Sequence, residues 1–172
     1  RKLYLGYERS SYDYDERRSR NALGVLSGAN PVLKYVYDVF SASIRQHLTG
    51  AVVAYIDYEL KLRADEALGY NNYDKNLFKL RLLYAYGKQV SFKLSASYWE
   101  RDYPNAFAFD NPATPGDNAK RYDGVTLQLA AHNEYKKNQS FFVKVKYDDE
   151  NSTDLRYQYQ RLQTAVGMEV DY

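Results

Sequence analysis

The stretch Gln89–Tyr103, QVSFKLSASYWERDY, decides the fold of this chain. Its apolar side chains fall at every second position, beginning with Val90, Phe92 and Leu94, and small or charged residues lie between them. A period of two predicts an extended strand rather than a helix. The alternation outlasts the roughly 5–6 residues of an ordinary strand and reaches the about 9–11 residues that a tilted strand needs to cross a bilayer. One apolar face and one polar face over this length are typical of an outer-membrane barrel strand.

The same alternation recurs along the chain and predicts one all-β domain over residues 1–172. We expect about eight strands in an antiparallel up-and-down transmembrane β-barrel, either a whole small barrel or the C-terminal part of a larger one. The expected strands lie within 2–9, 33–44, 51–64, 78–86, 89–103, 125–135, 141–147 and 155–172. The apolar parity changes around Val39, which we interpret as a β-bulge.

The connections between these strands alternate in length. Short turns are expected at 46–50, 87–89 and 136–139, and long connections at 65–74 and 104–121. Residues 10–31 are charged and rich in turn-forming residues, and are interpreted as the outer end of a hairpin plus a long loop. Pro104, Pro112 and Pro115 prevent 104–121 from joining a ladder throughout. Short periplasmic turns and long extracellular loops match this alternation, and 151–154 is an exception that a projecting hairpin explains.

The two faces of the strands predict two environments. The apolar side chains expected to face lipid include Phe92, Leu94, Leu127, Leu129, Val143 and Val145. The charged side chains expected to line the lumen are Asp57, Glu59, Lys61, Arg63, Lys79, Arg81, Lys93, Arg101, Glu134, Lys144 and Lys146. In a closed eight-stranded barrel these charges must pair, because the interior holds only side chains. In a wider barrel they would line water and tune ion preference, and both alternatives remain open.

The composition limits the function classes. A net charge of +2 without a dense basic patch argues against a nucleic-acid partner, and the absence of cysteine excludes disulfides and thiolate metal sites. Mean hydropathy is −0.69, and no run approaches the roughly 18 apolar residues of a membrane helix. The 20 tyrosines suit a membrane interface, where the ring is in the acyl boundary and the hydroxyl is wet. Several are expected at the ends of apolar faces: Tyr84, Tyr86, Tyr135 and Tyr172 near short turns, and Tyr98, Tyr122 and Tyr147 towards the loops.

The C-terminal sequence AVGMEVDY at 165–172 resembles the β-signal of bacterial outer-membrane proteins. Gly167, Val170 and Tyr172 fit that signal, while Ala165 stands where it has a polar residue. The segments YQYQR at 157–161 and KRYD at 120–123 are similar to the C-terminal barrels of export-associated outer-membrane proteins. Some of those barrels are tethered to periplasmic tetratricopeptide repeats in exopolysaccharide or lipoprotein export. The resemblance implies a bacterial outer-membrane location and insertion by the barrel assembly machinery.

Catalytic or cofactor chemistry is not predicted. His47 is expected in a short turn and His132 beside Glu134 on the lumen face, and both fit structural roles better than catalysis. No Gly-rich phosphate loop or metal-ligand spacing occurs, and the acids at 13, 15 and 16 fit a solvated loop better than a cation site. The sequence therefore predicts no enzyme, no cofactor and no metal.

We expect an outer-membrane channel, export conduit or membrane anchor, with a soluble all-β binding or adhesion module as the alternative. The expected partners are outer-membrane lipid, the barrel assembly machinery, and further strands or periplasmic domains of a longer chain or complex. No apolar leader follows Arg1, and the alternation begins at once. This start predicts either a signal peptide cleaved just upstream or the C-terminal piece of a longer protein.

Overall fold

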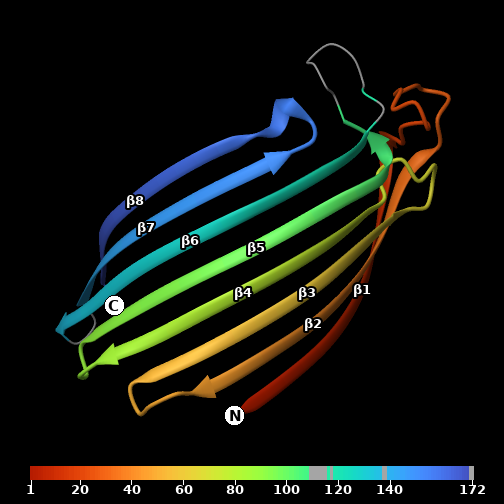
Figure 1. The fold of residues 1–172 in the computed structure, drawn as a ribbon. Helices are drawn as coiled ribbons and strands as arrows, with labels where there is room; N and C mark the ends of the chain where they lie inside the picture. The colour runs from red at the N-terminus through yellow and green to blue at the C-terminus, as the bar shows by residue number, and fades with distance from the viewer. Residues whose placement is uncertain (109–115, 117, 137–138, 171–172) are drawn as a thin grey trace.

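A single antiparallel sheet contains all eight strands, which pair in chain order from β1 to β8 (Figure 1). The structure is a computed structural model that describes residues 1–108, 116, 118–136 and 139–170. The strands are β1 (Lys2–Arg18), β2 (Val32–His47), β3 (Val52–Asp65), β4 (Tyr73–Tyr86), β5 (Val90–Phe107), β6 (Ala119–Lys136), β7 (Gln139–Ser152) and β8 (Tyr159–Val170), with the 3-10 turn η1 (Leu155–Tyr157) before β8. The predicted antiparallel meander of about eight strands is confirmed. No helix in the described ranges is long and apolar enough to cross a membrane.

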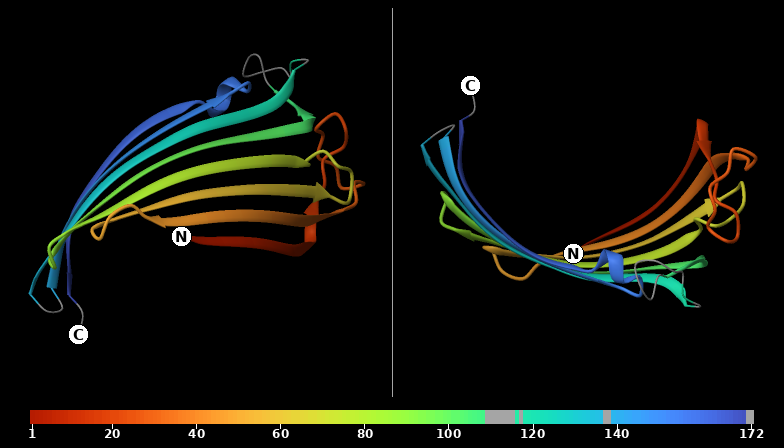
Figure 2. Two further views of the ribbon diagram at one scale, coloured as in Figure 1. Left: turned by 60° about the horizontal axis from the view of Figure 1, so that its bottom comes forward. Right: turned by 90° about the horizontal axis from the view of Figure 1, so that it is seen from above.

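The sheet is open rather than closed into a barrel. Ladders join each strand to the next in the chain, and β1 and β8 are the two edges of the sheet. Figure 2 shows the sheet twisted and bowed along its strands, with the long connections gathered at one end and the short turns at the other. The structure therefore shows the eight-stranded antiparallel sheet of the predicted fold but not its closure.

The register fixes which residues share a face, because directly opposite residues in a ladder lie on the same side of the sheet. One row joins Ile56, Leu80, Ala96 and Leu127, and the adjacent row joins Asp57, Lys79, Ser97 and Thr126. We call these two sides the apolar face and the polar face. All the residues predicted to face lipid lie on the apolar face, and all those predicted to line the lumen lie on the polar face.

β1 is longer than the sequence pattern predicts. It extends through the charged segment to Arg18, so the first part of 10–31 belongs to the strand and not to a loop. Tyr12 stays in register opposite Tyr35, and its ring packs against Tyr37 at 5.5 Å. The apolar alternation stops earlier because this part of the strand carries tyrosines and charges instead of aliphatic side chains.

The predicted β-bulge near Val39 is wrong. Pairing is continuous through this position, with Glu8 opposite Val39 on one side and Lys61 on the other. The parity change arises because the apolar side chains change faces along an unbroken strand. Those up to Val39 lie on the polar face, which is aromatic near the long connections, and those from Phe40 onward lie on the apolar face.

Both strands around the longest connection also extend further than predicted. β5 passes through Pro104 to Phe107, and β6 begins at Ala119. The register with β6 shifts between Tyr103 and Phe107, and pairing with β4 ends at Asp102, so Pro104 lies outside both ladders. Proline is compatible with a strand at such a position because no ladder hydrogen bond is lost. The predicted loop residues Pro112 and Pro115 lie outside the described residues.

The final hairpin turns later than predicted. β7 continues to Ser152, and β8 begins at Tyr159 rather than at 155. Between them Asp154 caps η1, with its side chain accepting a hydrogen bond from the backbone N–H of Arg156. Of the predicted turn at 151–154, the first two residues belong to β7 and only the last two begin the connection.

Candidate functional site

An exposed apolar belt crosses all eight strands on the apolar face. Its large side chains remain open to the surroundings: Leu5 is 77% exposed, Leu129 53% and Val166 77%. The belt also includes Leu3, Phe40, Ile56, Phe78, Leu80, Phe92, Leu94, Leu127, Phe141, Val143, Val145, Leu162 and Met168. No second layer covers this face in the described part of the chain (Figure 2). An apolar surface of this extent marks an interaction surface, since soluble monomers rarely expose one.

Aromatic rings border the belt on both sides. On the side of the long connections, Tyr7 packs against Phe40 with ring centroids 5.0 Å apart, and Tyr58 against Phe78 at 4.7 Å. On the side of the short turns, the ring pairs are Tyr84 with Phe92 at 6.1 Å and Tyr135 with Phe141 at 5.2 Å. Two aromatic girdles enclosing an apolar band are a recurrent feature of outer-membrane barrels.

The hydroxyl groups of the loop-side girdle point out of the belt. Tyr7 donates a hydrogen bond to Asp38 at 2.7 Å, and Tyr58 donates one to Asn76 at 2.8 Å. Tyr98 and Tyr147 make the same kind of contact, to Glu100 at 3.5 Å and to Asp149 at 3.3 Å. Each acceptor lies nearer the long connections than the ring does, so polar side chains follow the girdle, while on β3 Leu60 and Leu62 continue the apolar face beyond it.

On the polar face, some of the predicted lumen charges meet carboxylates. Arg81 contacts Asp57, with Nη2 and Oδ2 2.8 Å apart. Lys146 donates to Asp148 at 2.8 Å, and Arg161 donates to the same carboxylate at 2.9 Å. Sequence reasoning missed both residues: Asp148 lay just past the predicted strand 141–147, and Arg161 lay inside the predicted strand 155–172 but was not assigned to the lumen. The available signals were the parity of Asp148 with Lys146 in a longer strand and the alternation of Arg161 with the apolar Leu162.

Nearer the long connections, cations on the polar face pack against tyrosine rings. The guanidinium carbon of Arg63 lies 4.5 Å from the ring centroid of Tyr35 and 4.3 Å from that of Tyr73. Arg101 is 5.3 Å from Tyr73, and Lys120 Nζ is 4.4 Å from Tyr157. Such cation–π contacts stabilise a cation by about 0.5–2 kcal/mol.

These residues form a tyrosine layer, which we define as Tyr35, Tyr73, Tyr103, Tyr122 and Tyr157 with Arg63, Arg101 and Lys120. The rings of Tyr73, Tyr103, Tyr122 and Tyr157 follow one another at 5.5, 5.8 and 5.9 Å across β4, β5, β6 and η1. Tyr35, Tyr73 and Tyr122 are buried, which places all the buried tyrosines of the described core here. The placement of Tyr122 on an apolar face is therefore wrong.

The connections above the tyrosine layer are held by buried carboxylates. Asp65 accepts hydrogen bonds from the Ser19 hydroxyl at 3.1 Å and from Asn71 Nδ2 at 3.1 Å, which links the β1–β2 and β3–β4 connections. Asp154 is fully buried and accepts from Arg156 Nη2 at 2.6 Å, while Lys120 Nζ lies 3.6 Å away. This end of the polar face is thus a packed structure.

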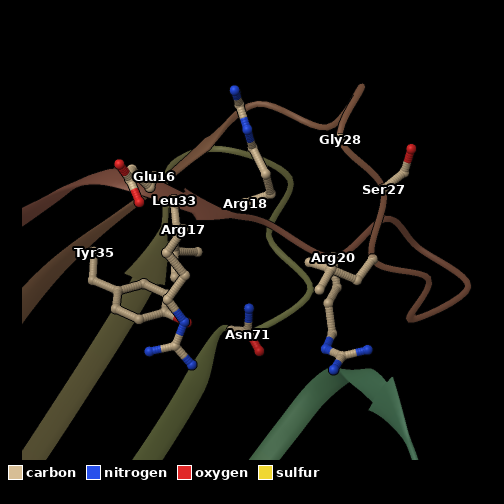
Figure 3. Close-up of a pocket in the computed structure, with 10 residues that line it drawn as sticks. Glu16, Arg17, Arg18, Arg20, Ser27, Gly28, Leu33, Tyr35 and Asn71 are labelled. Atoms are coloured by element: carbon tan, nitrogen blue, oxygen red, sulfur yellow. The ribbon is translucent and has the colours of Figure 1, made fainter.

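A cavity of about 470 Å³ opens beside the tyrosine layer, between the end of β1 and the β3–β4 connection (Figure 3). Arg17 lies next to the Tyr35 ring, while Arg18 and Arg20 extend in different directions. Arg18 Nη1 donates to the Asn30 carbonyl at 3.4 Å, and Arg20 Nη1 donates to the Gly24 carbonyl at 2.7 Å. The cavity presents basic side chains at the mouth of the polar face.

No catalytic constellation appears among these residues. His132 Nε2 lies 4.0 Å from Glu169, His47 lines the polar face near the short turns, and Glu134 lies opposite Ser140. Within the described ranges no cluster of histidine and acidic side chains could hold a metal ion.

The residues of the β-signal-like end occupy distinct places. The Phe142 ring lies over Gly167, where a β-carbon would approach it to 2.5 Å, so a side chain there would displace the ring. Val170 lies on the apolar face opposite Gln139, and Tyr172 lies outside the described residues. Searches of protein-family models, curated proteins and solved structures find no match to this chain.

Proposed function

We propose that this sheet forms part of the wall of a bacterial outer-membrane β-barrel. The barrel assembly machinery inserts it, and it serves as a conduit or as a membrane anchor. The single observation that supports this most is the uncovered apolar belt between its two aromatic girdles. On β4 the belt runs from Phe78 to Tyr86. That is about nine residues, the length a tilted strand needs to cross a bilayer.

A soluble binding or adhesion module is the competing function. Its sheet would need a second layer or a partner over the apolar face, because burial stabilises apolar surface by about 25 cal/mol per Å². In a membrane, lipid takes that place, and the outward tyrosine hydroxyls meet the interfacial water and headgroups. The hydroxyl contacts to Asp38, Asn76 and Asp149 support the membrane function over the soluble one.

The charges of the polar face favour a conduit over a plugged anchor. Lys79, Lys93 and Lys144 form no ion pair or hydrogen bond with any residue that the structure describes. In the packed interior of a closed eight-stranded barrel, each unpaired ammonium group would cost several kcal/mol. Facing water, the same groups cost little and favour anions. We therefore propose a wider, water-filled barrel to which this chain contributes eight strands and to which further strands contribute the rest.

Two adjacent positions of β6 test the membrane placement. The chain has no cysteine, so Leu129→Cys and Gln128→Cys each introduce one attachment point for a polarity-sensitive fluorophore. The protein is refolded into vesicles that contain lipids with brominated acyl chains. The label at position 129 should be quenched by the brominated chains, and the label at position 128 by aqueous iodide. Iodide quenching of both labels, in a protein that stays in solution without detergent, would favour the soluble module.

A further inference from the structure

The polar face carries a second hollow, at the end opposite the tyrosine layer. Its volume is about 670 Å³, and its lining includes Val53, Leu83, Ala85, Ala130 and Phe142. We call this the short-turn hollow. Its apolar lining is unusual for this face, because the central rows of the same side carry mainly charged and hydroxyl side chains. These apolar side chains belong neither to the apolar belt nor to a packed core. Exposed apolar side chains of this kind indicate that a ligand covers them.

Two neighbouring ladder rows build this hollow. The first row runs from Val53 through Leu83, Lys93, Ala130 and Lys144. The next row towards the short turns runs Ala85, Ser91, His132, Phe142 and Gly167. Small side chains at 85, 91 and 130 leave the floor open, while Leu83 and Phe142 supply the walls. The register itself therefore creates the space.

The charges around the hollow are mainly positive. Lys93 and Lys144 both lie directly opposite Ala130, one on each side, and so stand two strands or roughly 10 Å apart. Neither ammonium group has an ion-pair or hydrogen-bond partner among the described residues. The one carboxylate in the described lining, Glu169, lies 4.0 Å from His132. Two unpaired cations at the rim of an apolar hollow complement an anionic group attached to a hydrocarbon chain.

We propose that the short-turn hollow binds a single-chain anionic amphiphile. The hydrocarbon chain lies against Leu83, Ala130 and Phe142, and the headgroup contacts Lys93 and Lys144. The volume is within the roughly 300–1,000 Å³ of small-molecule sites. A stable protein–protein interface buries about 800 Å² on each partner and needs a larger surface than this hollow offers, so a small molecule fits it better than a protein segment does. The site lies on the polar face, so it differs from the lipid contact proposed for the apolar belt and does not depend on it.

Photolabelling with a long-chain fatty acid that carries a diazirine in its acyl chain tests this site. The full chain is embedded in lipid nanodiscs, irradiated with the probe, and the labelled positions are mapped by peptide mass spectrometry. We expect label on the segments of β4 and β7 that contain Leu83 and Phe142. Oleate should compete for these positions on the order of tenfold better than oleyl alcohol, since only oleate presents a charge-assisted hydrogen-bond acceptor to the lysines.

Three variants separate the charge from the cavity. Lys93→Gln combined with Lys144→Gln should lower labelling of the hollow on the order of tenfold, and Lys79→Gln, on the same face outside the hollow, should not. Ala130→Leu keeps both lysines but fills the floor, so it should abolish the labelling. Unchanged labelling in the double variant and in Ala130→Leu would overturn the proposal, as would equal competition by oleyl alcohol.

The same labelling experiment also tests the proposed membrane function independently of the amphiphile site. Probe dissolved in the bilayer should label belt residues such as Leu94 and Leu129 whether or not the hollow binds it. Label confined to the belt would overturn the amphiphile site and leave the membrane proposal standing. Label confined to the hollow would support the amphiphile site and contradict the membrane placement of the belt.

Discussion

At the scale of single residues, tyrosine has two distinct roles in this protein. On the apolar face its ring borders the belt and its hydroxyl points outward, as in the bond from Tyr7 to Asp38. On the polar face the flat side of the tyrosine ring contacts cations, as where Arg63 lies between Tyr35 and Tyr73. Tyrosine combines an apolar ring with a polar hydroxyl, which suits the border of the belt. The electron-rich face of the same ring attracts cations, which suits the polar face.

Neighbouring residues that face opposite sides of the sheet should differ in how strongly their substitution impairs folding in lipid. Leu94 lies on the apolar face and Lys93 on the polar face of β5. An arginine on the lipid side at mid-depth costs roughly 2–4 kcal/mol. Leu94→Arg should therefore reduce the yield of folded protein in lipid vesicles far more than Lys93→Gln. Equal or reversed losses would mean that the apolar face is not the lipid-facing side.

Arg63 should be a main stabilising residue of the tyrosine layer. Besides its contacts with the rings of Tyr35, Tyr73 and Tyr103, its Nε donates a hydrogen bond to the Asn71 carbonyl at 2.8 Å. Arg63→Gln should lower the free energy of unfolding by about 1–3 kcal/mol, whereas Lys79→Gln, which removes no contact, should change it little. Urea unfolding followed by the fluorescence of the single tryptophan, Trp99, measures both. Equal midpoints for the two variants would contradict the stabilising role.

The Asp154 carboxylate should make the β7–β8 connection sensitive to acid. Its hydrogen bonds from Arg156, aided by Lys120, hold the pKa of Asp154 below its ordinary value of 3.8. A lowered folded-state pKa means that the ionised carboxylate stabilises the fold above pH 3.8, and that this contribution disappears as the pH falls through the lowered value. Asp154→Asn should therefore lower the urea midpoint at pH 7 and have a smaller effect at pH 2. A constant difference between the two pH values would exclude this linkage.

At the scale of elements, the long connections and the short turns occupy opposite ends of the strands. Asp65 fastens the β1–β2 connection to the β3–β4 connection, and Asn105 Nδ2 donates to the Gly69 carbonyl at 2.8 Å. The β1–β2 connection, the β3–β4 connection and the end of β5 are therefore linked above the tyrosine layer. Tight turns connect β2 to β3 and β4 to β5 at the opposite end.

The two ends should lie on opposite sides of the membrane. Gly28 in the β1–β2 connection and Gly50 in the β2–β3 turn both have open space where a β-carbon would be placed, so a cysteine fits at either position. On intact cells, Gly28→Cys should react with a membrane-impermeant maleimide, and Gly50→Cys should react only after the outer membrane is permeabilised. The reverse pattern would invert the proposed orientation.

At the scale of the whole molecule, the unpaired lysines of the polar face should determine ion preference. The full-length protein in a planar bilayer should show a steady conductance with weak anion preference. Lys79→Glu and Lys144→Glu should each shift the reversal potential towards cations, while Lys88→Gln, in the β4–β5 turn, should leave it unchanged. A silent bilayer with well-folded protein would contradict the conduit and favour the anchor.

The sequence by itself determined the number of strands and the existence of their two faces, but not where each strand ends. A period of two is a local property, so Val90, Phe92 and Leu94 identify their common side without knowledge of their neighbours. The same reasoning found the eight-stranded meander and the short turn at Gly87, where φ is 67° and glycine is favoured.

Only the tertiary structure decided which side chains meet across strands. The stacking of Arg63 between Tyr35 and Tyr73 depends on the register of three strands, and the unbroken pairing at Val39 depends on both neighbours of β2. The short-turn hollow exists because Ala130 lies between Lys93 and Lys144, in one row assembled from distant segments. Alternation assigns a residue to a face, but cross-strand contacts come from long-range pairing, which no local pattern encodes.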